Sequence, residues 1–530
     1  MPATAQHGTT DKETDVSTEL RPAAAVPRVD RLATAHAQDA PDAVALVSQE
    51  GERLSYAELD RMVDRTAAAL AAHGVRAGDR VAVFLENSLN ALPMVLGAMR
   101  AGAWAVPLNA RLTEAEATAI VRHAGPKAIL CCVDGSQAAD RHARRLGCVA
   151  MDGLPDHVAV SVQGQATDTL ADRPDVAVLI YTSGTTGVPK GVMLTHANLG
   201  FVMGLAPDTG WFRAGERVYS VLPLSHSYGL VTVGLSALGA GATLMPVRRF
   251  AAEHAAEAIR SGAVQAFLGV PTLYDRLIHH AADTGTALTP NALRIAYVGG
   301  APLDPERKAR AEALLGVTLA NGYGLTEASP TVTRTAPGTA SADLSVGLPV
   351  PGVAVELRDG GGAPVAADQD GRLFVRGPNV MAGYYKDPDG TRAVLDDRGW
   401  LDTGDIARRD ARGRLFIVGR AKDVIIRSGF NVYPEEVERA LNALPGVALS
   451  AVIGARAGAD EQVLAWVQPE AGATLAPDAM IAAVKQRLAP YKVPAHIHVV
   501  DALPLTATGK VRKAALAALL PASAKPGVAP

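Results

Sequence analysis

A stretch rich in glycine and hydroxyl residues, Tyr181–Gly191, is the feature that most constrains how this chain folds. It follows an apolar run, Val176–Ile180, which predicts a buried strand. Gly184 and Gly187 let the backbone approach an anion closely and adopt positive φ. Successive backbone N–H groups and hydroxyls can then donate to phosphate, with Lys190 as the counter-charge. We therefore predict a phosphate-binding loop after a strand rather than an ordinary polar turn, although the spacing is not that of a Walker A loop.

Helical and strand-like patterns alternate along the chain from Val29 onwards. Residues Tyr56–Leu70 have the apolar spacing of an amphipathic helix, and Ser55 is a suitable N-cap. Val81–Leu85 is a short apolar run of the kind that forms a buried strand. The alternation predicts an α/β fold layered around a parallel sheet. Further strands are expected at 104–108, 128–133, 218–224, 242–247, 266–270 and 293–298, and further helices at 90–99 and 251–260.

The pattern changes beyond Pro337. Short β-like segments separated by Gly, Asp and Pro predict a small antiparallel subdomain between Gly347 and Val418. We expect a boundary near Gly419–Asp423, followed by a compact α+β domain of about a hundred residues. The predicted organisation is a disordered tail at 1–27, a large N-terminal domain at 28–420, a mobile C-terminal domain at 421–518 and a frayed tail at 519–530.

The composition excludes several classes of protein. With 530 residues, 48% of them hydrophobic and 20% charged, the chain is long enough for more than one globular domain. A formal net charge of −3 gives no electrostatic footprint for nucleic acid. We find no apolar run of roughly 18 residues that would predict a transmembrane helix, and no secretory signal. The 3 cysteines form no Cys-x-x-Cys pair, so we expect a reduced, cytoplasmic setting; a monomer and a homodimer both stay open.

A second motif, Asn321–Glu327, combines an aromatic ring with hard oxygen atoms. Tyr323 stands between two glycines and can offer a flat face to a base. Thr326 and Glu327 follow with a hydroxyl and a carboxylate, and a hard oxygen ligand of this kind suits Mg²⁺. Taken alone, a tyrosine between two glycines would also fit a β-turn.

Three further stretches contain residues typical of nucleotide sites. Gly299–Leu303 follows a predicted strand and leaves a backbone edge open to a flat ligand, although a simple strand-to-helix turn also fits. Asp405 is the kind of carboxylate that binds a ribose diol. The Thr-Gly loop before Lys510 could carry that lysine into a distant cleft, whereas a single lysine in a terminal loop is ordinarily solvated surface.

Together these motifs resemble the adenylate-forming superfamily, which includes acyl-CoA synthetases, adenylation domains of peptide synthetases and luciferases. The Thr-Ser-Gly-Thr-Thr-Gly-x-Pro-Lys-Gly sequence within Tyr181–Gly191 is that family's signature. The motifs occur in the family's order, and the resemblance extends over about Val29–Leu516. It implies a reaction with ATP through an acyl-adenylate.

The resemblance also implies which residues bind ATP. Tyr323 would stack on adenine, while Asp405 would bind the ribose hydroxyls with help from Arg420. The full set of expected ATP- and AMP-binding residues is Thr182, Ser183, Gly184, Thr185, Thr186, Gly187, Lys190, Gly299, Gly300, Ala301, Asn321, Gly322, Tyr323, Gly324, Thr326, Asp405, Arg420 and Lys510.

Four residues are expected to act in catalysis, namely Lys510, His226, Thr326 and Glu327. By resemblance, Lys510 is the catalytic lysine of adenylation, Thr326 touches phosphate and Glu327 is the metal ligand that holds Mg²⁺. His226 taken alone is more often a buried core residue, but in acyl-CoA synthetases this position lies near the acyl carboxylate. Adenylation domains for α-amino acids usually carry an aspartate there, so an amino-acid substrate is disfavoured.

The resemblance places the acyl pocket at six residues, His226, Tyr228, Gly300, Ala301, Ser329 and Pro330. Most residues in these stretches are small or apolar, which suits an apolar tail. The stretches contain no evident arginine for a second carboxylate, although Arg334 is close by in sequence. Aryl acids of the coumarate or benzoate kind and medium-chain fatty acids are both compatible with this lining.

The resemblance implies a hinge at Lys422, and Gly429 in the loop that turns towards the active site for thioester formation. An ordinary linker before a helix is the alternative. The expected function is an AMP-forming acyl-CoA ligase that uses ATP, Mg²⁺, coenzyme A and a small-molecule carboxylic acid, namely an apolar aryl or fatty monocarboxylic acid. Alternatives are a stand-alone enzyme that loads an acyl carrier protein and a nucleotide-binding regulator without catalysis. Loss of Lys510 or Glu327 would mark the regulator, and both residues are present.

Overall fold

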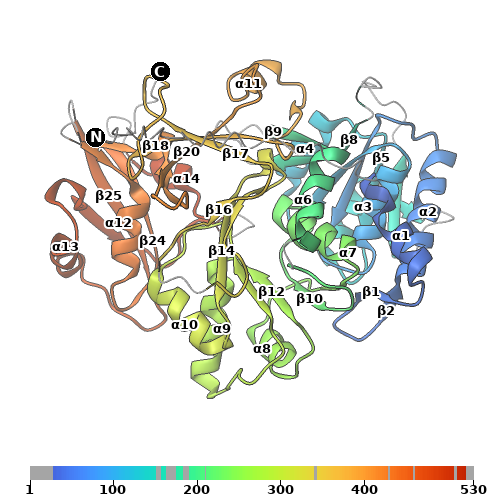
Figure 1. The fold of residues 1–530 in the computed structure, drawn as a ribbon, viewed down its shortest axis with the longest axis horizontal. Coiled ribbons are helices and arrows are strands. Elements are labelled where there is room, and N and C mark those ends of the chain that lie inside the picture. The colour runs from blue at the N-terminus through green and yellow to red at the C-terminus, as the bar shows by residue number, and fades with distance from the viewer. Residues whose placement is uncertain are drawn as a thin grey trace, which may run out of the picture.

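The computed structural model describes residues 28–150, 157–162, 173, 175–182, 190–208, 211–339, 343–427, 430–457, 460–505 and 510–520. The predicted tail 1–27 and most of 519–530 lie outside these residues. The described chain forms a large N-terminal domain of sheets and helices and a smaller C-terminal domain, which is the predicted fold class (Figure 1). None of its helices combines the length and apolar character that a membrane span requires.

The first large sheet of the N-terminal domain has a parallel centre and antiparallel edges. Its described strands follow the order β19-β9-β8-β4-β3-β5-β7-β6, and β3, β4, β5 and β8 are parallel. Their bounds are Arg80–Leu85 for β3, Trp104–Asn109 for β4, Ala128–Cys132 for β5, Val149–Ala150 for β6, Val158–Val162 for β7, Val176–Thr182 for β8, Lys190–Thr195 for β9 and Gly383–Tyr384 for β19. The strand predicted before the glycine-rich stretch is therefore present as β8.

The second large sheet is built in the same way. Its described strands follow the order β16-β15-β14-β13-β12-β10-β11-β1-β2, with parallel pairing from β14 to β1 and antiparallel pairing at both ends. Their bounds are Val44–Val47 for β1, Arg53–Ser55 for β2, Arg217–Ser220 for β10, Thr243–Pro246 for β11, Ala266–Gly269 for β12, Ile295–Val298 for β13, Leu319–Gly324 for β14, Thr331–Arg334 for β15 and Leu348–Pro349 for β16. The strand predicted at 218–224 ends early, at Ser220, and beyond it the carbonyl of Leu222 and the N–H of Leu224 are hydrogen-bonded to the side chain of Asn87.

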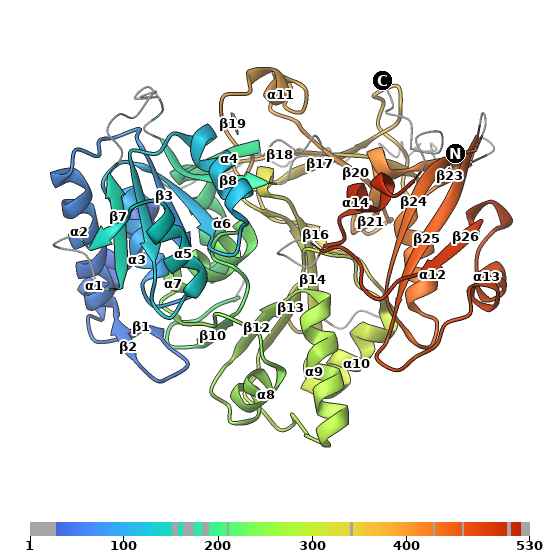
Figure 2. The same cartoon turned by 180° about the vertical axis from the view of Figure 1, so that it is seen from behind.

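Helices cover both large sheets. The predicted amphipathic helix is α2, and Ser55 and Glu58 form a reciprocal capping box at its start. Figure 1 shows α1, α2 and α3 on one side of the first sheet, and Figure 2 shows α4 and α5 on the other. The bounds are Leu32–Asp39 for α1, Tyr56–Ala72 for α2, Ala91–Arg100 for α3, Glu114–Ala124 for α4, Gln137–Arg145 for α5, His196–Asp208 for α6, Tyr228–Leu235 for the π-helix η2, Ser236–Gly239 for α7, Ala252–Arg260 for α8, Pro271–Thr284 for α9 and Pro305–Leu315 for α10.

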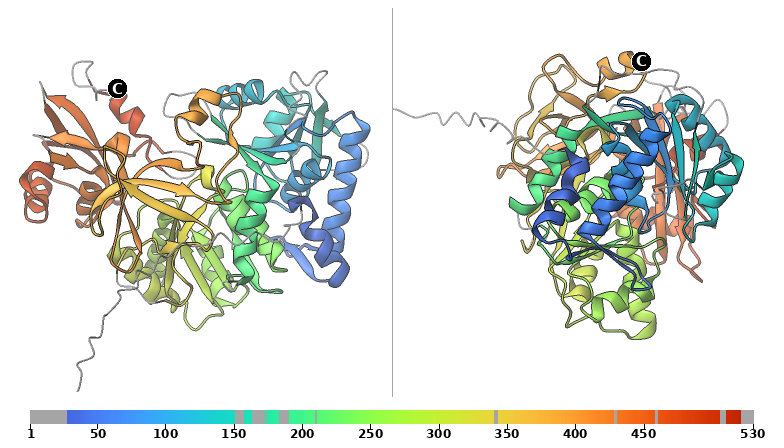
Figure 3. Two further views of the ribbon diagram at one scale, coloured as in Figure 1. Left: turned by 45° about the horizontal axis from the view of Figure 1, so that its top comes forward. Right: turned by 90° about the vertical axis from the view of Figure 1, so that its right-hand side faces the viewer.

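The predicted antiparallel subdomain is present as a four-stranded sheet in the order β17-β18-β20-β21. The strands span Ala354–Arg358 for β17, Asp370–Arg376 for β18, Leu401–Arg409 for β20 and Leu415–Arg420 for β21, and α11 spans Pro388–Arg392. This sheet lies between the large domain and the C-terminal domain (Figure 3). It therefore carries Asp405 and Arg420 to the place where the two domains meet.

The C-terminal domain has the predicted α+β composition. Its three-stranded sheet has the order β24-β25-β26, and its apolar core contains Val437, Val463 and Met480. The bounds are Ala421–Asp423 for the 3₁₀ turn η4, Ile425–Arg427 for β22, Phe430–Val432 for β23, Pro434–Asn442 for α12, Val447–Ala457 for β24, Asp460–Pro469 for β25, Pro477–Lys485 for α13, His496–Val499 for β26 and Lys513–Ala518 for α14. The domain boundary at 420/421 stays a prediction.

Candidate active site

The glycine-rich stretch is the connection of a β-hairpin. Thr182 ends β8, Lys190 begins β9, and the two residues are paired across the antiparallel ladder. Five of the expected phosphate-binding residues, Ser183, Gly184, Thr185, Thr186 and Gly187, lie outside the described residues, as does Gly429 of the expected thioester loop. The ammonium of Lys190 lies over the ring of Tyr384, 4.6 Å from its centroid.

The Asn321–Glu327 motif runs from β14 into the 3₁₀ turn η3 (Thr326–Ala328). A Cβ on Gly322 would clash with the hydroxyl of Tyr297, and one on Gly324 would clash with the carbonyl of Pro330. The two glycines around Tyr323 are therefore required by packing from neighbouring strands. The alternative of a β-turn at Tyr323 is wrong, because the residue lies within a strand.

Tyr323, Asp405 and Arg420 form one hydrogen-bonded cluster. The hydroxyl of Tyr323 donates to Asp405 Oδ2, and Arg420 Nε lies 3.0 Å from Asp405 Oδ1. Asp405 and Arg420 face each other across β20 and β21. Burial raises the pKa of Asp405, while the charge of Arg420 opposes that rise. The carboxylate is therefore held in place from two sides, as a group that binds a ribose diol must be.

Lys510 reaches this cluster from the far end of the chain. Burial lowers the pKa of its ammonium; Arg420 lowers it further, whereas Asp405 and Glu327 raise it. These interactions put Lys510 within electrostatic reach of residues that are about 90 to 180 positions away in sequence. Lys510 thus lies near these residues, and its role in adenylation stays a prediction.

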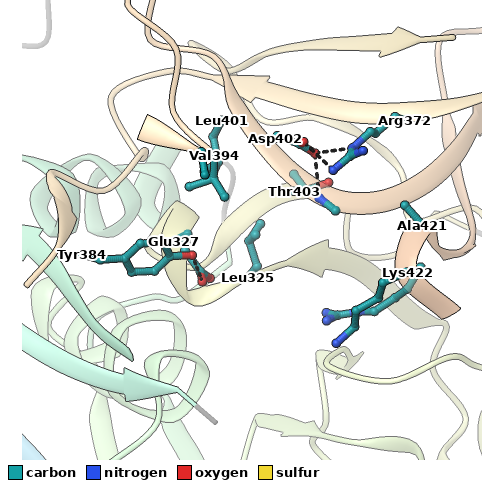
Figure 4. Close-up of a pocket in the computed structure, with 13 residues that line it drawn as sticks. Leu325, Glu327, Arg372, Tyr384, Val394, Leu401, Asp402, Thr403, Ala421 and Lys422 are labelled. Atoms are coloured by element: carbon teal, nitrogen blue, oxygen red, sulfur yellow. Dashed lines mark hydrogen bonds and ion pairs between the residues drawn. The ribbon is translucent and has the colours of Figure 1, made fainter. Parts of the chain in front are cut away.

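Glu327 is positioned by a residue that the sequence analysis missed. The hydroxyl of Tyr384, on β19, donates to Glu327 Oε1 at 2.9 Å (Figure 4). Among the described residues no group of three or more His, Cys, Asp or Glu side chains is arranged for a metal. Mg²⁺, however, takes few protein ligands and keeps water and phosphate, so a single oriented carboxylate fits its chemistry.

A cavity of about 360 Å³ lies beside Glu327, between the large domain, the antiparallel sheet and the start of the C-terminal domain. Lys422, the expected hinge residue, lines it from η4, and burial lowers the pKa of its ammonium. Figure 4 shows Glu327 and Lys422 from different parts of the chain around this cavity. Its lining residues are Leu325, Glu327, Arg372, Tyr384, Ala393, Val394, Leu401, Asp402, Thr403, Gly404, Arg420, Ala421 and Lys422.

His226 lies in the turn before η2 and is joined to the same site. Its Nδ1 accepts the backbone N–H of Tyr228 at 3.3 Å. Burial, helped by the charge of Lys510, lowers the pKa of His226 to about 4, so the imidazole is neutral at neutral pH. The next residue, Ser227, lies 3.0 Å from Thr326 through the two hydroxyl oxygens. This contact connects the turn that contains His226 with the Asn321–Glu327 motif.

Beyond His226, two tyrosines and a glycine pair lie together. Tyr228 donates to the carbonyl of Gly269 at 3.3 Å and meets Tyr297 edge to face, with ring centroids 6.0 Å apart. A Cβ added to Gly299 would lie 3.5 Å from the Tyr228 hydroxyl, and Gly300 has a φ of +80°. The glycines have no side chains, so their backbone lies directly against the two tyrosine rings.

The remaining predicted pocket residues differ in their exposure. Ala301 is exposed at the turn after β13, whereas Ser329 and Pro330 are buried in the segment between η3 and β15. Because no surface of Ser329 is open to solvent, its place in the pocket stays a prediction. Arg334, noted only for its nearness in sequence, lies over the ring of Trp211 at 5.1 Å from the centroid.

Comparisons with known proteins agree with this arrangement. Residues 33–385 match the model of a family described as AMP-binding enzyme, and residues 436–510 match the AMP-binding enzyme C-terminal domain. A feruloyl-CoA synthase of an Amycolatopsis species is 36% identical over 486 residues, which are 90% of this chain and 96% of that protein. The indoleacetate–CoA ligase of Aromatoleum aromaticum is 34% identical over 477 residues, 87% of this chain and 92% of the relative. The crystal structure of ATP-bound MatB from Rhodopseudomonas palustris superposes with a TM-score of 0.80 at 31% identity, covering 92% of this chain and 98% of MatB.

Proposed function

Because this chain belongs to the AMP-binding enzyme family, we propose that it is an AMP-forming acyl-CoA ligase. It joins a carboxylic acid to coenzyme A and converts ATP to AMP and diphosphate. The observation that carries the proposal is the convergence of Lys510, Glu327 and Asp405, which come from three separate parts of the chain. A regulator that only bound nucleotide would not need a lysine beside a carboxylate that suits a metal.

In the first half-reaction a carboxylate oxygen of the acid attacks the α-phosphorus of ATP, and the bond to diphosphate breaks. Lys510 stabilises the negative charge that gathers between the two reacting groups. Asp405 and Tyr323 hold the ribose and the adenine, which fixes the line of attack. Glu327 would hold Mg²⁺, which would supply charge neutralisation on the phosphates. His226 stays neutral beside the acyl carboxylate, so it can donate a hydrogen bond without adding a charge.

In the second half-reaction the thiol of coenzyme A attacks the acyl carbonyl carbon, the thiol proton is lost to solvent and AMP leaves. We propose that the C-terminal domain turns about Lys422 between the two steps, withdraws Lys510 and brings the loop around Gly429 to the site. Lys422 lies in the 3₁₀ turn that follows β21 and lines the cavity, which supports its role as the hinge. Such a motion separates two sets of contacts that cannot exist at once.

The acid that fits best is an apolar monocarboxylic acid, either aryl or fatty. The ring of Tyr228, which lies beside Gly300, favours a flat ring, because aromatic groups pack well edge to face. The names of the feruloyl and indoleacetate relatives support an aryl acid. The turn that contains His226 has no aspartate or glutamate that could pair with the ammonium group of an α-amino acid. An α-amino acid would therefore bring an unpaired positive charge into a buried site.

The proposal also covers where the protein acts, where its domains divide and its oligomeric state. We place the reaction in the cytoplasm, since all three cysteines are free thiols. We place the domain boundary at 420/421 and treat a monomer and a homodimer as equally compatible with the site.

Diphosphate release with a panel of benzoate, cinnamate, octanoate, propionate and phenylalanine, with and without coenzyme A, tests the function. We expect turnover with apolar acids, AMP as the nucleotide product and an acyl-CoA in the mass spectrum. Lys510→Ala should reduce adenylation by about 10² or more, whereas Lys485→Ala, on α13, should not. Formation of ADP and orthophosphate would contradict the proposal, and adenylation without any acyl-CoA would show that the acceptor is another thiol.

A further inference from the structure

Two of the three cysteines lie against each other near one edge of the first large sheet. The Sγ atoms of Cys131 and Cys148 are 3.8 Å apart, although the residues are 17 positions apart in sequence. Cys131 is on β5, and Cys148 lies between α5 and β6. Both thiols are free, and neither residue lines the cavity beside Glu327. The fold therefore brings two oxidisable sulfur atoms together outside the candidate active site.

The two cysteines differ in how firmly their backbones are held. β5 is an inner strand, and Cys131 is paired with Phe84 of β3 on one side and with Ala159 of β7 on the other. Cys148 precedes β6, the last strand of this sheet, and its N–H donates to the carbonyl of Ala143 near the end of α5 at 2.8 Å. A disulfide needs sulfur atoms about 2.0 Å apart. Closure therefore requires the edge segment with Cys148 to approach an inner strand that stays in place.

The two thiols also differ in exposure and in acidity. Cys131 is fully buried, whereas Cys148 is partly exposed. The contact with the Cys131 thiol lowers the pKa of Cys148, and burial opposes that shift. The same contact, together with burial, raises the pKa of Cys131. Because the thiolate is the reactive form of cysteine, Cys148 is the thiol that meets a dissolved oxidant first.

Cys132 is next to Cys131 in sequence but lies on the other face of the sheet. Successive side chains of a strand point to opposite faces, and these two accordingly pack into different apolar cores. Cys148 packs against the core that contains Cys131. Burial raises the pKa of Cys132 to about 12. The chain thus offers a third thiol, on the same strand, as an internal control.

We propose that Cys131 and Cys148 form a reversible disulfide in response to peroxide, with Cys148 oxidised first and Cys131 as the resolving thiol. The thiolate of Cys148 attacks one oxygen of hydrogen peroxide, the O–O bond breaks, and a sulfenic acid and hydroxide result. The Cys131 thiol then attacks the sulfur of the sulfenic acid, the S–S bond forms, and water leaves with the Cys131 proton. The two thiols lose two electrons, and the peroxide is reduced to water.

The disulfide would have two consequences for the chain. It would close a ring from Cys131 to Cys148 that contains α5, and so join the end of that helix to the inner strand β5. It would also protect Cys148 from further oxidation, because sulfinic acid forms only where no second thiol captures the sulfenic acid. In a reducing compartment such a bond is transient, which agrees with the free thiols of the resting protein.

Peptide mapping of the folded protein after treatment with hydrogen peroxide tests the proposal. Remaining thiols are alkylated before digestion. We expect a Cys131–Cys148 linked peptide with a loss of about 2 Da that dithiothreitol reverses, while Cys132 stays alkylated. A linkage to Cys132 or between two chains would overturn the proposal. So would three unmodified cysteines at a peroxide dose that fully oxidises free glutathione.

Three single variants test the order of the two steps. In Cys131→Ala, Cys148 should advance to the sulfinic acid with a gain of about 32 Da, whereas Cys132→Ala should form the disulfide at the wild-type rate. Cys148→Ser changes a partly exposed position, so it decides the order independently of how well Cys131→Ala folds. We expect Cys131 in Cys148→Ser to be oxidised at least about tenfold more slowly than Cys148 in the wild type. Equal rates would overturn the assignment of Cys148 as the first site.

Discussion

Removal of the phenolic hydroxyl of Tyr384 isolates one contact of the site. Tyr384→Phe keeps the ring over which Lys190 lies and deletes only the donor to Glu327 Oε1, at 2.9 Å. A hydrogen bond to a charged acceptor contributes about 1.5–3 kcal/mol. Each 1.4 kcal/mol is about tenfold. Loss of a partner that orients a metal ligand has an effect of about 10- to 100-fold on metal affinity or activity. Because Glu327 borders an open cavity, we expect the lower end of this range, about tenfold.

Diphosphate release measured over a Mg²⁺ titration is the assay for this prediction. We expect the Mg²⁺ midpoint of Tyr384→Phe to rise by about tenfold, because Glu327 is no longer oriented. Tyr385→Phe is the matched control, since that neighbouring hydroxyl donates to the carbonyl of Ala124 at 3.5 Å, away from Glu327. In a Glu327→Gln background the Tyr384 change should have no further effect on the midpoint. Equal midpoints for the two Phe variants would refute the reasoning.

Three further predictions concern packing, specificity and pH. Gly324→Ala should destabilise the fold by about 1–3 kcal/mol, because the added Cβ clashes with the carbonyl of Pro330; thermal unfolding against Gly204→Ala, which meets no atom within 4 Å, checks it. Ala301→Phe should lower kcat/KM for cinnamate more than for propionate, and equal losses would place Ala301 outside the tail of the pocket. Burial raises the pKa of the Glu435 carboxyl from its ordinary value of 4.5 to about 7 in the folded protein. The protonated carboxyl therefore stabilises the fold fully below pH 4.5, and this stabilisation is lost as the pH rises to about 7. Glu435→Gln should flatten that part of the denaturation profile, and an unchanged slope would contradict the assignment.

Features of the fold could be predicted wherever they depend on residues that are neighbours in sequence. The apolar run before Tyr181, the N-cap at Ser55 and the small antiparallel subdomain are all confirmed. Each depends on interactions within a few residues, such as capping, turn formation and alternation of burial. The roles assigned to individual residues remain predictions, and the phosphate loop itself lies outside the described residues.

Contacts between residues that are far apart in sequence could not be predicted from the sequence. Tyr384 belongs to a two-residue strand, and nothing near it in sequence indicates that its hydroxyl reaches Glu327. The contact between Ser227 and Thr326 joins residues that are 99 positions apart. Gly322 and Gly324 were attributed to a flat ligand face, but packing against Tyr297 and Pro330 already requires them. These contacts arise where strands from distant segments lie side by side, so only the folded chain reveals them.

The chemical groups of the site and their order could be read from the chain alone, because backbone freedom, charge and side-chain type are properties of single residues. Lys510, Glu327 and Asp405 could each be named as a site residue by family resemblance alone. Their common environment, in which the charges of Asp405 and Glu327 act on the ammonium of Lys510, became visible in the folded chain. The physical reason is that electrostatic coupling and desolvation depend on distance in space and on the surrounding atoms. Both are set by how the C-terminal domain packs against the large sheets.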